Sequence, residues 1–129
     1  MDSFNSYSNE EMLLHNNSLQ VIYIHSENTI YFNGHLSDSD EHILGNLFRK
    51  IKKIIFFEKK LKLNLKYLES FPHSSIALFY QLVKIKLGKS ICFSFITSNK
   101  MKWQHKWLDN IKKLSINAGN QVFIIYQDN

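Results

Sequence analysis

The sequence predicts a single α/β domain with a mixed, mostly parallel sheet of about five strands and three main helices. Three observations lead to this class. Runs of β-branched and aromatic residues alternate along the chain with segments of helical periodicity. A length of 129 residues fits one domain with one core. Hydrophobic residues make up 44% of the chain, against only four Gly and one Pro, which excludes collagen-like and wholly disordered chains.

The chain begins with a polar stretch and continues with a hairpin. Residues 1–18 are rich in Ser, Asn and acids without periodicity, so we interpret them as a polar flexible leader before a domain of residues 19–129. Residues 19–25 and 29–34 are rich in β-branched and aromatic types, and Ser26-Glu27-Asn28 supplies turn chemistry between them. This pattern predicts a β-hairpin.

Next, the sequence predicts a helix over 38–57. Ser37 offers a side-chain N-cap, and the acids of the first turn complement the helix dipole. The helical period is carried by seven apolar residues: Ile43, Leu44, Leu47, Phe48, Ile51, Ile54 and Ile55.

The remaining residues predict three strands and two helices in alternation. Strands are expected at 61–67, 90–96 and 122–126. One helix is expected over the apolar residues from 76 to 87, with Ser74 or Ser75 as N-cap and Gly88 as the stop, and another over 103–114. Strand–helix–strand units favour right-handed crossovers between parallel strands.

Composition and charge limit the classes of function that the chain can have. A single Cys excludes an intramolecular disulfide framework and fits a reducing compartment. No apolar run is long enough to span a membrane, so we expect a cytoplasmic protein without a membrane partner. Residues 1–48 hold seven acids and no Lys or Arg, whereas residues 49–129 hold 16 bases against four acids. Because dispersed Lys also suits a solvated surface, nucleic acid is the less favoured partner.

The sequence shows no standard catalytic or metal-binding motif, so we expect neither an enzyme nor a cofactor. His35 and His42 match no standard ligand spacing, and no metal site is predicted. Cys92 lies within an apolar run and is predicted to be a core residue. Trp103 and Trp107 are four residues apart, which favours packing on one helix face over stacking on bases.

Ser74 and Ser75 are the candidate functional residues. They follow a Pro-containing loop at a predicted strand-to-helix junction, where unpaired backbone N–H groups and the helix dipole favour a phosphate. The alternative is an ordinary N-cap worth about 1 kcal/mol. Local chemistry alone favours the cap.

The order of elements and the string Phe71-Pro72-His73-Ser74-Ser75-Ile76-Ala77 together resemble the STAS family, the domains of anti-sigma factor antagonists and sulfate transporter tails. Gly34, Leu36 and the residues 37–40 look like the family's entry to its first helix. Trp103-Gln104, followed by Leu108, Ile111 and Leu114, is similar to a signature of STAS-like bacterial regulators. Two departures are His73, where the family carries an acid or amide, and Ile76, where it carries Gly.

The resemblance implies a STAS-like fold over residues 19–126 and a bacterial signalling role. Ser74 matches the serine that a partner kinase phosphorylates, and Ser75 matches the second serine. The implied partners are a serine kinase or anti-sigma-type regulator and a phosphatase, contacted through His73, Ser74, Ser75 and Ile76. Phosphorylation would then act as a charge switch that releases the partner.

Two alternatives stay open. A nucleic-acid-binding module would use the Lys-rich C-terminal half, and its affinity would fall steeply with salt. A constitutive scaffold subunit would have no switch, and Ser74 would serve only as a helix cap. Self-association into a homodimer is also left open.

Overall fold

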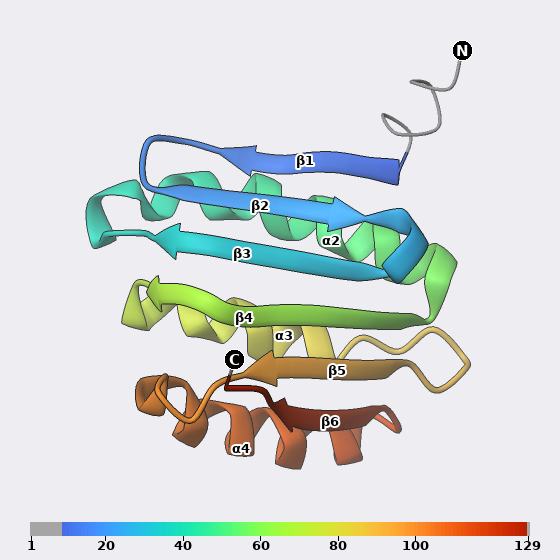
Figure 1. The fold of residues 1–129 in the computed structure, drawn as a ribbon. Helices are drawn as coiled ribbons and strands as arrows, with labels where there is room; N and C mark the ends of the chain where they lie inside the picture. Colours follow the sequence, from blue (N-terminus) through green and yellow to red (C-terminus); the bar gives the residue numbers. More distant parts are fainter. Residues whose placement is uncertain (1–8, 129) are drawn as a thin grey trace.

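The computed structural model describes residues 9–128. They form one six-stranded mixed sheet whose strands follow each other in chain order, from β1 at one edge to β6 at the other (Figure 1). The prediction of an α/β fold with a mixed sheet and three main helices is confirmed, with one more strand than expected.

The first three strands form an antiparallel meander. They are β1 (Glu10–His15), β2 (Leu19–Ile24) and β3 (Thr29–His35). The short 3₁₀ helix η1 (His25–Glu27) joins β2 to β3, so the predicted hairpin is confirmed.

The second half of the sheet is parallel, as its crossover helices require. Its strands are β3, β4 (Lys60–Ser70), β5 (Cys92–Thr97) and β6 (Gln121–Tyr126). The crossovers are α2 (Leu44–Glu58), α3 (Ile76–Val83) and α4 (Lys102–Asn117). All three helices lie on the same face of the sheet (Figure 1), which is what crossovers of one hand between successive neighbouring strands produce.

The core lies between this helical layer and the sheet. Phe79 of α3 is its centre, with a ring centroid 5.0 Å from that of Phe48 and 5.2 Å from that of Trp107. Along β2 the residues alternate between buried and half-exposed, since successive side chains point to opposite faces. Leu19, Val21 and Tyr23 face the helices.

Part of the predicted leader is a strand. Residues 1–8 lie outside the described residues, but Glu10–His15 pairs with β2 as an edge strand, so the interpretation of these residues as unstructured is wrong. Leu13 is 2% exposed and belongs to the core, which is the physical reason for the pairing. Two neighbouring glutamates and a register shift between Met12 and Leu14 interrupt the alternation that would identify the strand from sequence. Both features are typical of edge strands.

The helix boundaries differ from the prediction in two places. Residues 38–43 form the 3₁₀ helix η2 (Asp38–Ile43), and α2 starts only at Leu44. Ser37 makes no side-chain cap, since its hydroxyl lies beside Ser39 and Asp40. Helix α3 ends at Val83 instead of reaching residue 87, because the side-chain amide of Asn120 donates to the carbonyls of Val83 and Ile85 at 2.8 Å.

No described helix covers the other face of the sheet. Cys92 lies on this face and is partly exposed, so the prediction of a core residue is wrong for its side chain. The reason is alternation: Phe93 and Phe95 point into the core, and Cys92 points away from it. Among residues 9–128, no helix combines the length and the apolar content that crossing a lipid bilayer requires.

Candidate functional site

The predicted site residues lie where β4 leads into α3. Phe71 is 8% exposed and packs its ring against Phe79 at 5.5 Å, which anchors the connection to the core. The 3₁₀ helix η3 (His73–Ser75) follows, held by a bond of 2.9 Å from the Ser75 N–H to the Pro72 carbonyl. The two serines therefore sit on a short, well-fixed turn.

The hydroxyls of both serines bind one carboxylate. Ser74 Oγ donates to Glu41 Oε2 at 2.5 Å, and Ser75 Oγ donates to the same oxygen. We call this arrangement the serine clasp: Ser74, Ser75 and Glu41. The hydrogen bond from Ser74, and to a smaller extent the one from Ser75, holds the pKa of Glu41 below its ordinary value, because both bonds favour the ionised carboxylate. The clasp ties the start of α3 to η2, the turn that precedes α2.

The prediction that Ser74 or Ser75 caps the helix is wrong. Ser75 occupies the N-cap position of α3 and Pro72 that of η3, and neither residue makes a side-chain hydrogen bond to the start of its helix. The hydroxyls face a carboxylate, and they do not meet the backbone N–H groups of the helix start as expected.

The four predicted partner-binding residues differ in exposure. His73 and Ser74 are exposed, whereas Ser75 is 3% exposed and Ile76 is 7% exposed. Of the two serines, only Ser74 therefore presents its side chain to an approaching protein.

Ser74 lies on the rim of a groove between α3 and α4. We call it the α3–α4 groove, and its volume is about 560 Å³. Aromatic and aliphatic side chains dominate its lining, with a few polar groups among them: Phe71, His73, Ser74, Ile76, Ala77, Tyr80, Trp103, Lys106, Trp107 and Asn110. The groove thus combines an apolar surface, which a partner's side chains can bury, with an exposed hydroxyl at its edge.

Both tryptophans contribute to this groove as well as to the core. Trp107 is 5% exposed and Trp103 packs against the core from a partly buried position, which confirms the prediction that both pack on the domain. Their ring centroids are 6.1 Å apart. The indole Nε1 atoms are buried, and neither has a hydrogen-bond acceptor among the described residues.

Gln104 ties α4, which forms one side of the groove, to the sheet. Its side chain is fully buried, and its Nε2 donates to the carbonyls of Leu65 at 2.9 Å and Leu68 at 3.1 Å. Its Oε1 accepts from Thr97 Oγ1 at 2.6 Å. One amide thereby joins α4, the end of β4 and the end of β5, and it sets the position from which the chain enters η3.

Glu41 is the site residue that sequence analysis missed. Its position in the first turn of a predicted helix suggested only a favourable dipole contact. The residue lies 33 positions before Ser74, and no local pattern connects the two.

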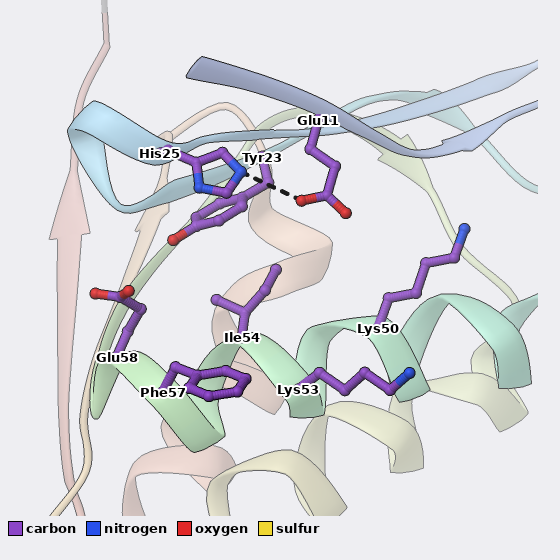
Figure 2. A pocket seen from close by; sticks show the side chains of 8 residues that line it. All are labelled: Glu11, Tyr23, His25, Lys50, Lys53, Ile54, Phe57 and Glu58. Atoms are coloured by element: carbon purple, nitrogen blue, oxygen red, sulfur yellow. Dashed lines mark hydrogen bonds and ion pairs between the residues drawn. The ribbon is translucent and has the colours of Figure 1, made fainter. Parts of the chain in front are cut away.

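A second cleft lies at the opposite end of the sheet, between β1, β2 and α2 (Figure 2). Its volume is about 490 Å³, and charged groups of both signs line it around apolar side chains: Glu11, Tyr23, His25, Lys50, Lys53, Ile54, Phe57 and Glu58. His25 Nε2 lies 3.2 Å from Glu11 Oε1. Burial, followed by the charges of Glu58 and Glu11, raises the pKa of Tyr23.

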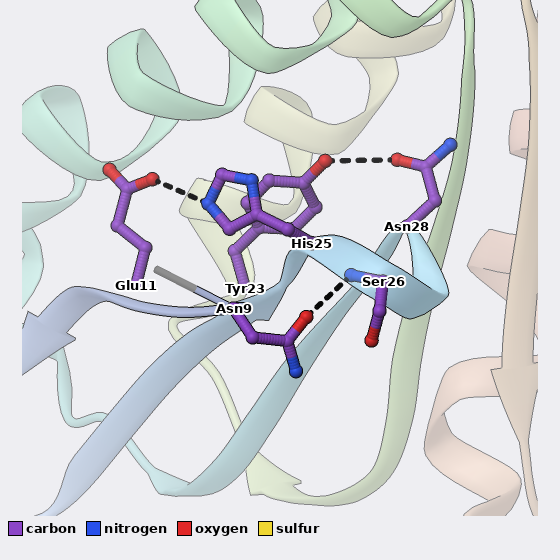
Figure 3. A network of polar contacts seen from close by, with 6 residues as sticks. All are labelled: Asn9, Glu11, Tyr23, His25, Ser26 and Asn28. Atoms are coloured by element: carbon purple, nitrogen blue, oxygen red, sulfur yellow. Dashed lines mark hydrogen bonds and ion pairs between the residues drawn. The ribbon is translucent and has the colours of Figure 1, made fainter. Parts of the chain in front are cut away.

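Polar contacts around this cleft join β1 and the residue before it to η1, and they join β2 to the residue after η1 (Figure 3). The Ser26 N–H donates to Asn9 Oδ1 at 2.9 Å, and the Tyr23 hydroxyl donates to Asn28 Oδ1 at 3.1 Å. His25 also stacks on Tyr23 in a tilted arrangement, with ring centroids 4.3 Å apart.

Within the described part of the chain, no cluster of three or more His, Cys, Asp or Glu side chains is arranged to hold a metal ion. His35 instead lies 3.8 Å from the Glu69 carboxylate. No protein-family model, curated protein or solved structure matches this chain.

Proposed function

We propose that this chain is a STAS-like regulatory protein that binds a partner protein through the α3–α4 groove and is controlled by phosphorylation of Ser74. The observation that carries the proposal is the exposed Ser74 hydroxyl, which lies on the rim of the groove and is bonded to Glu41. The partners would be a serine kinase or anti-sigma-type regulator and a phosphatase.

The architecture supports this proposal. A β-hairpin leads into α2, and the serine turn follows the next strand, as the resemblance to STAS domains implies. Because one fold hosts many functions, the proposal depends on the site more than on the fold.

The clasp supplies a physical mechanism for a switch. Transfer of the terminal phosphoryl group of a nucleoside triphosphate to Ser74 Oγ releases the nucleoside diphosphate and the hydroxyl proton, so Glu41 loses the hydrogen bond that it accepts from Ser74. The phosphate adds about −1.5 to −2 charges next to an ionised carboxylate. Repulsion then opens the clasp, and the rim of an apolar groove gains a strongly hydrated dianion. Both changes disfavour a partner that docks on the neutral hydroxyl.

Ser74 is the better acceptor of the two serines. A kinase must reach the hydroxyl, and the buried Ser75 would require the start of α3 to move. Both serines stay in the proposed site, with Ser74 as acceptor and Ser75 as the second donor to Glu41.

The test compares four baits of the full chain in native lysate, read by mass spectrometry: wild type, Ser74→Asp, Ser90→Asp and Ala77→Arg. Ser90→Asp adds the same charge at an exposed position outside the groove. Ala77→Arg obstructs the groove at an exposed position that is not part of the clasp. Phosphosites are mapped on the wild-type bait.

We expect a kinase or phosphatase to be captured by wild type and Ser90→Asp and lost from Ser74→Asp and Ala77→Arg. We also expect phosphate on Ser74 in the recovered wild-type bait, which would support Ser74 as the acceptor. If all four baits capture the same proteins and Ser74 is never modified, the switch is wrong and a constitutive binding module replaces it.

A further inference from the structure

The outer face of α2 carries cations that are followed by exposed aromatic rings. Its residues recur at helical spacing on the side opposite the core: Arg49, Lys52, Lys53, Phe56 and Phe57. We call this surface the α2 patch. The core side of the same helix is formed by Leu44, Leu47, Phe48, Ile51 and Ile55. The helix is therefore apolar on its inner face and again at the end of its outer face.

The two phenylalanines are unusual for a solvent-facing helix surface. Phe56 is 61% exposed and Phe57 is 80% exposed, and their rings meet edge to face with centroids 6.2 Å apart. Neighbouring exposed rings of this size form a contiguous apolar surface, which on a monomeric protein marks a contact site.

The surrounding charges have one predominant sign. Arg49, Lys52 and Lys53 make no ion pair with any described residue. Lys59 adds a fourth cation, with its Nζ 5.7 Å from the centre of the Phe56 ring. An open hollow of about 490 Å³ lies between the three outer-face cations and the two rings. Lys53 and Phe57 also border the neighbouring cleft, where Lys50 contributes a further cation and Glu11 and Glu58 contribute carboxylates (Figure 2).

We propose that the α2 patch docks on the surface of an anionic lipid bilayer, with Phe56 and Phe57 entering the headgroup region and the cations contacting lipid phosphates. Exposed aromatic residues next to clustered Lys and Arg are the composition of helices that lie on membranes. Specific protein interfaces also favour Phe and Arg but are depleted in Lys, which supplies two of the three outer-face cations here. Few polar groups other than cations lie beside the patch: Asn46, whose Oδ1 accepts from Arg49 at 2.6 Å, and Glu58, which follows Phe57.

The sequence-based expectation of no membrane partner depended on the lack of a spanning segment. Attachment to a bilayer surface needs no such segment, since two inserted rings and several cations can act together. The α2 patch does not include the serine clasp, and the inference does not depend on the proposed function.

The test is co-sedimentation of the full chain with phosphatidylcholine vesicles, with and without phosphatidylglycerol. We expect binding only to the anionic vesicles, weakened by added salt. Phe56→Ser/Phe57→Ser and Lys52→Glu/Lys53→Glu should each weaken binding roughly tenfold or more. All these positions are exposed, and circular dichroism of each variant checks the fold.

Two further variants separate the patch from general electrostatics. Lys112→Glu/Lys113→Glu makes the same charge change on an adjacent exposed pair of α4 and should retain most of the binding. Glu58→Gln removes the acid next to Phe57 and should strengthen binding.

Three results would overturn the proposal. The wild type binds neither vesicle type, Lys112→Glu/Lys113→Glu loses as much binding as Lys52→Glu/Lys53→Glu, or Phe56→Ser/Phe57→Ser binds as well as the wild type. A parallel titration with labelled single-stranded RNA tests the nucleic-acid alternative. RNA binding that needs the α2 patch, without vesicle binding, would overturn the proposal in favour of that alternative.

Discussion

At the scale of single residues, Glu41 connects two parts of the chain that share no local pattern. Its carboxylate accepts from two hydroxyls at once, and the lowered pKa of Glu41 records that both bonds favour the ionised form. Protonation removes the negative charge that strengthens both bonds, so a neutral carboxylic acid would accept them more weakly. The clasp is therefore coupled to pH as well as to phosphorylation.

The coupling predicts the effect of Glu41→Gln. A carboxyl whose folded pKa is depressed stabilises the fold above its unfolded pKa, ordinarily 4.5, and this contribution is lost as the pH falls through the folded value. We expect the variant to be less stable than wild type at neutral pH. The difference should shrink as the pH drops below that ordinary value. Urea unfolding across this pH range measures both curves, and curves that stay parallel would contradict a role of the Glu41 charge.

Gln104 is a second residue whose contacts predict a stability effect, because its buried side-chain amide satisfies three polar groups. Gln104→Leu leaves two carbonyls of β4 and the Thr97 hydroxyl without their partner in the core. We expect a loss of about 3 kcal/mol, since each buried unsatisfied group costs about 1–3 kcal/mol. Denaturant unfolding gives the value. The exposed Gln127→Leu serves as control and should change stability by less than about 0.5 kcal/mol. Equal losses would mean that the amide bonds contribute little.

At the scale of elements, the close approach of β3 to Ser18, the residue before β2, depends on one glycine. Gly34 has φ +115°, and a Cβ at this position would lie 2.0 Å from the Ser18 carbonyl oxygen. We expect Gly34→Ala to cost about 3 kcal/mol or more, because backbone would have to move. The control is Gly45→Ala in α2, where a Cβ meets nothing within 4 Å. It should be neutral or stabilise by up to about 1 kcal/mol, as thermal unfolding would show. Similar melting temperatures for both variants would contradict this account.

Elements with a strong period were predictable, and those fixed by distant contacts were not. The apolar spacing of α2 and α4 and the alternation in β2 identify their type, because each buries one face. Strand β1 is held by pairing and by Leu13, which a polar stretch conceals. The end of α3 depends on Asn120, 37 residues after Val83. For the same reason, the sequence located Ser74 at a strand-to-helix junction but not its partner Glu41.

At the scale of the whole molecule, the two sheet edges differ. Strand β1 carries Glu10 and Glu11 and a register shift, and both features discourage pairing with another sheet. Strand β6 contains no charged residue and no Pro. Its Phe123 is 51% exposed and Ile125 is 37% exposed, on the face of the sheet that no described helix covers. The free edge of β6 thus lacks the usual protection against strand addition.

This asymmetry predicts how the molecule aggregates. A lysine within an edge strand opposes pairing by charge and by desolvation, so Phe123→Lys should slow aggregation during heating, followed by light scattering. Net charge alone also keeps proteins apart, and the chain already carries +5. The matched control is Asn117→Lys, which adds the same charge at an exposed position of α4. If both variants aggregate at the same rate, the effect belongs to net charge and β6 is not the site of association. If only Phe123→Lys is slowed, association involves β6, because both variants gain the same charge and only Phe123 lies in that strand.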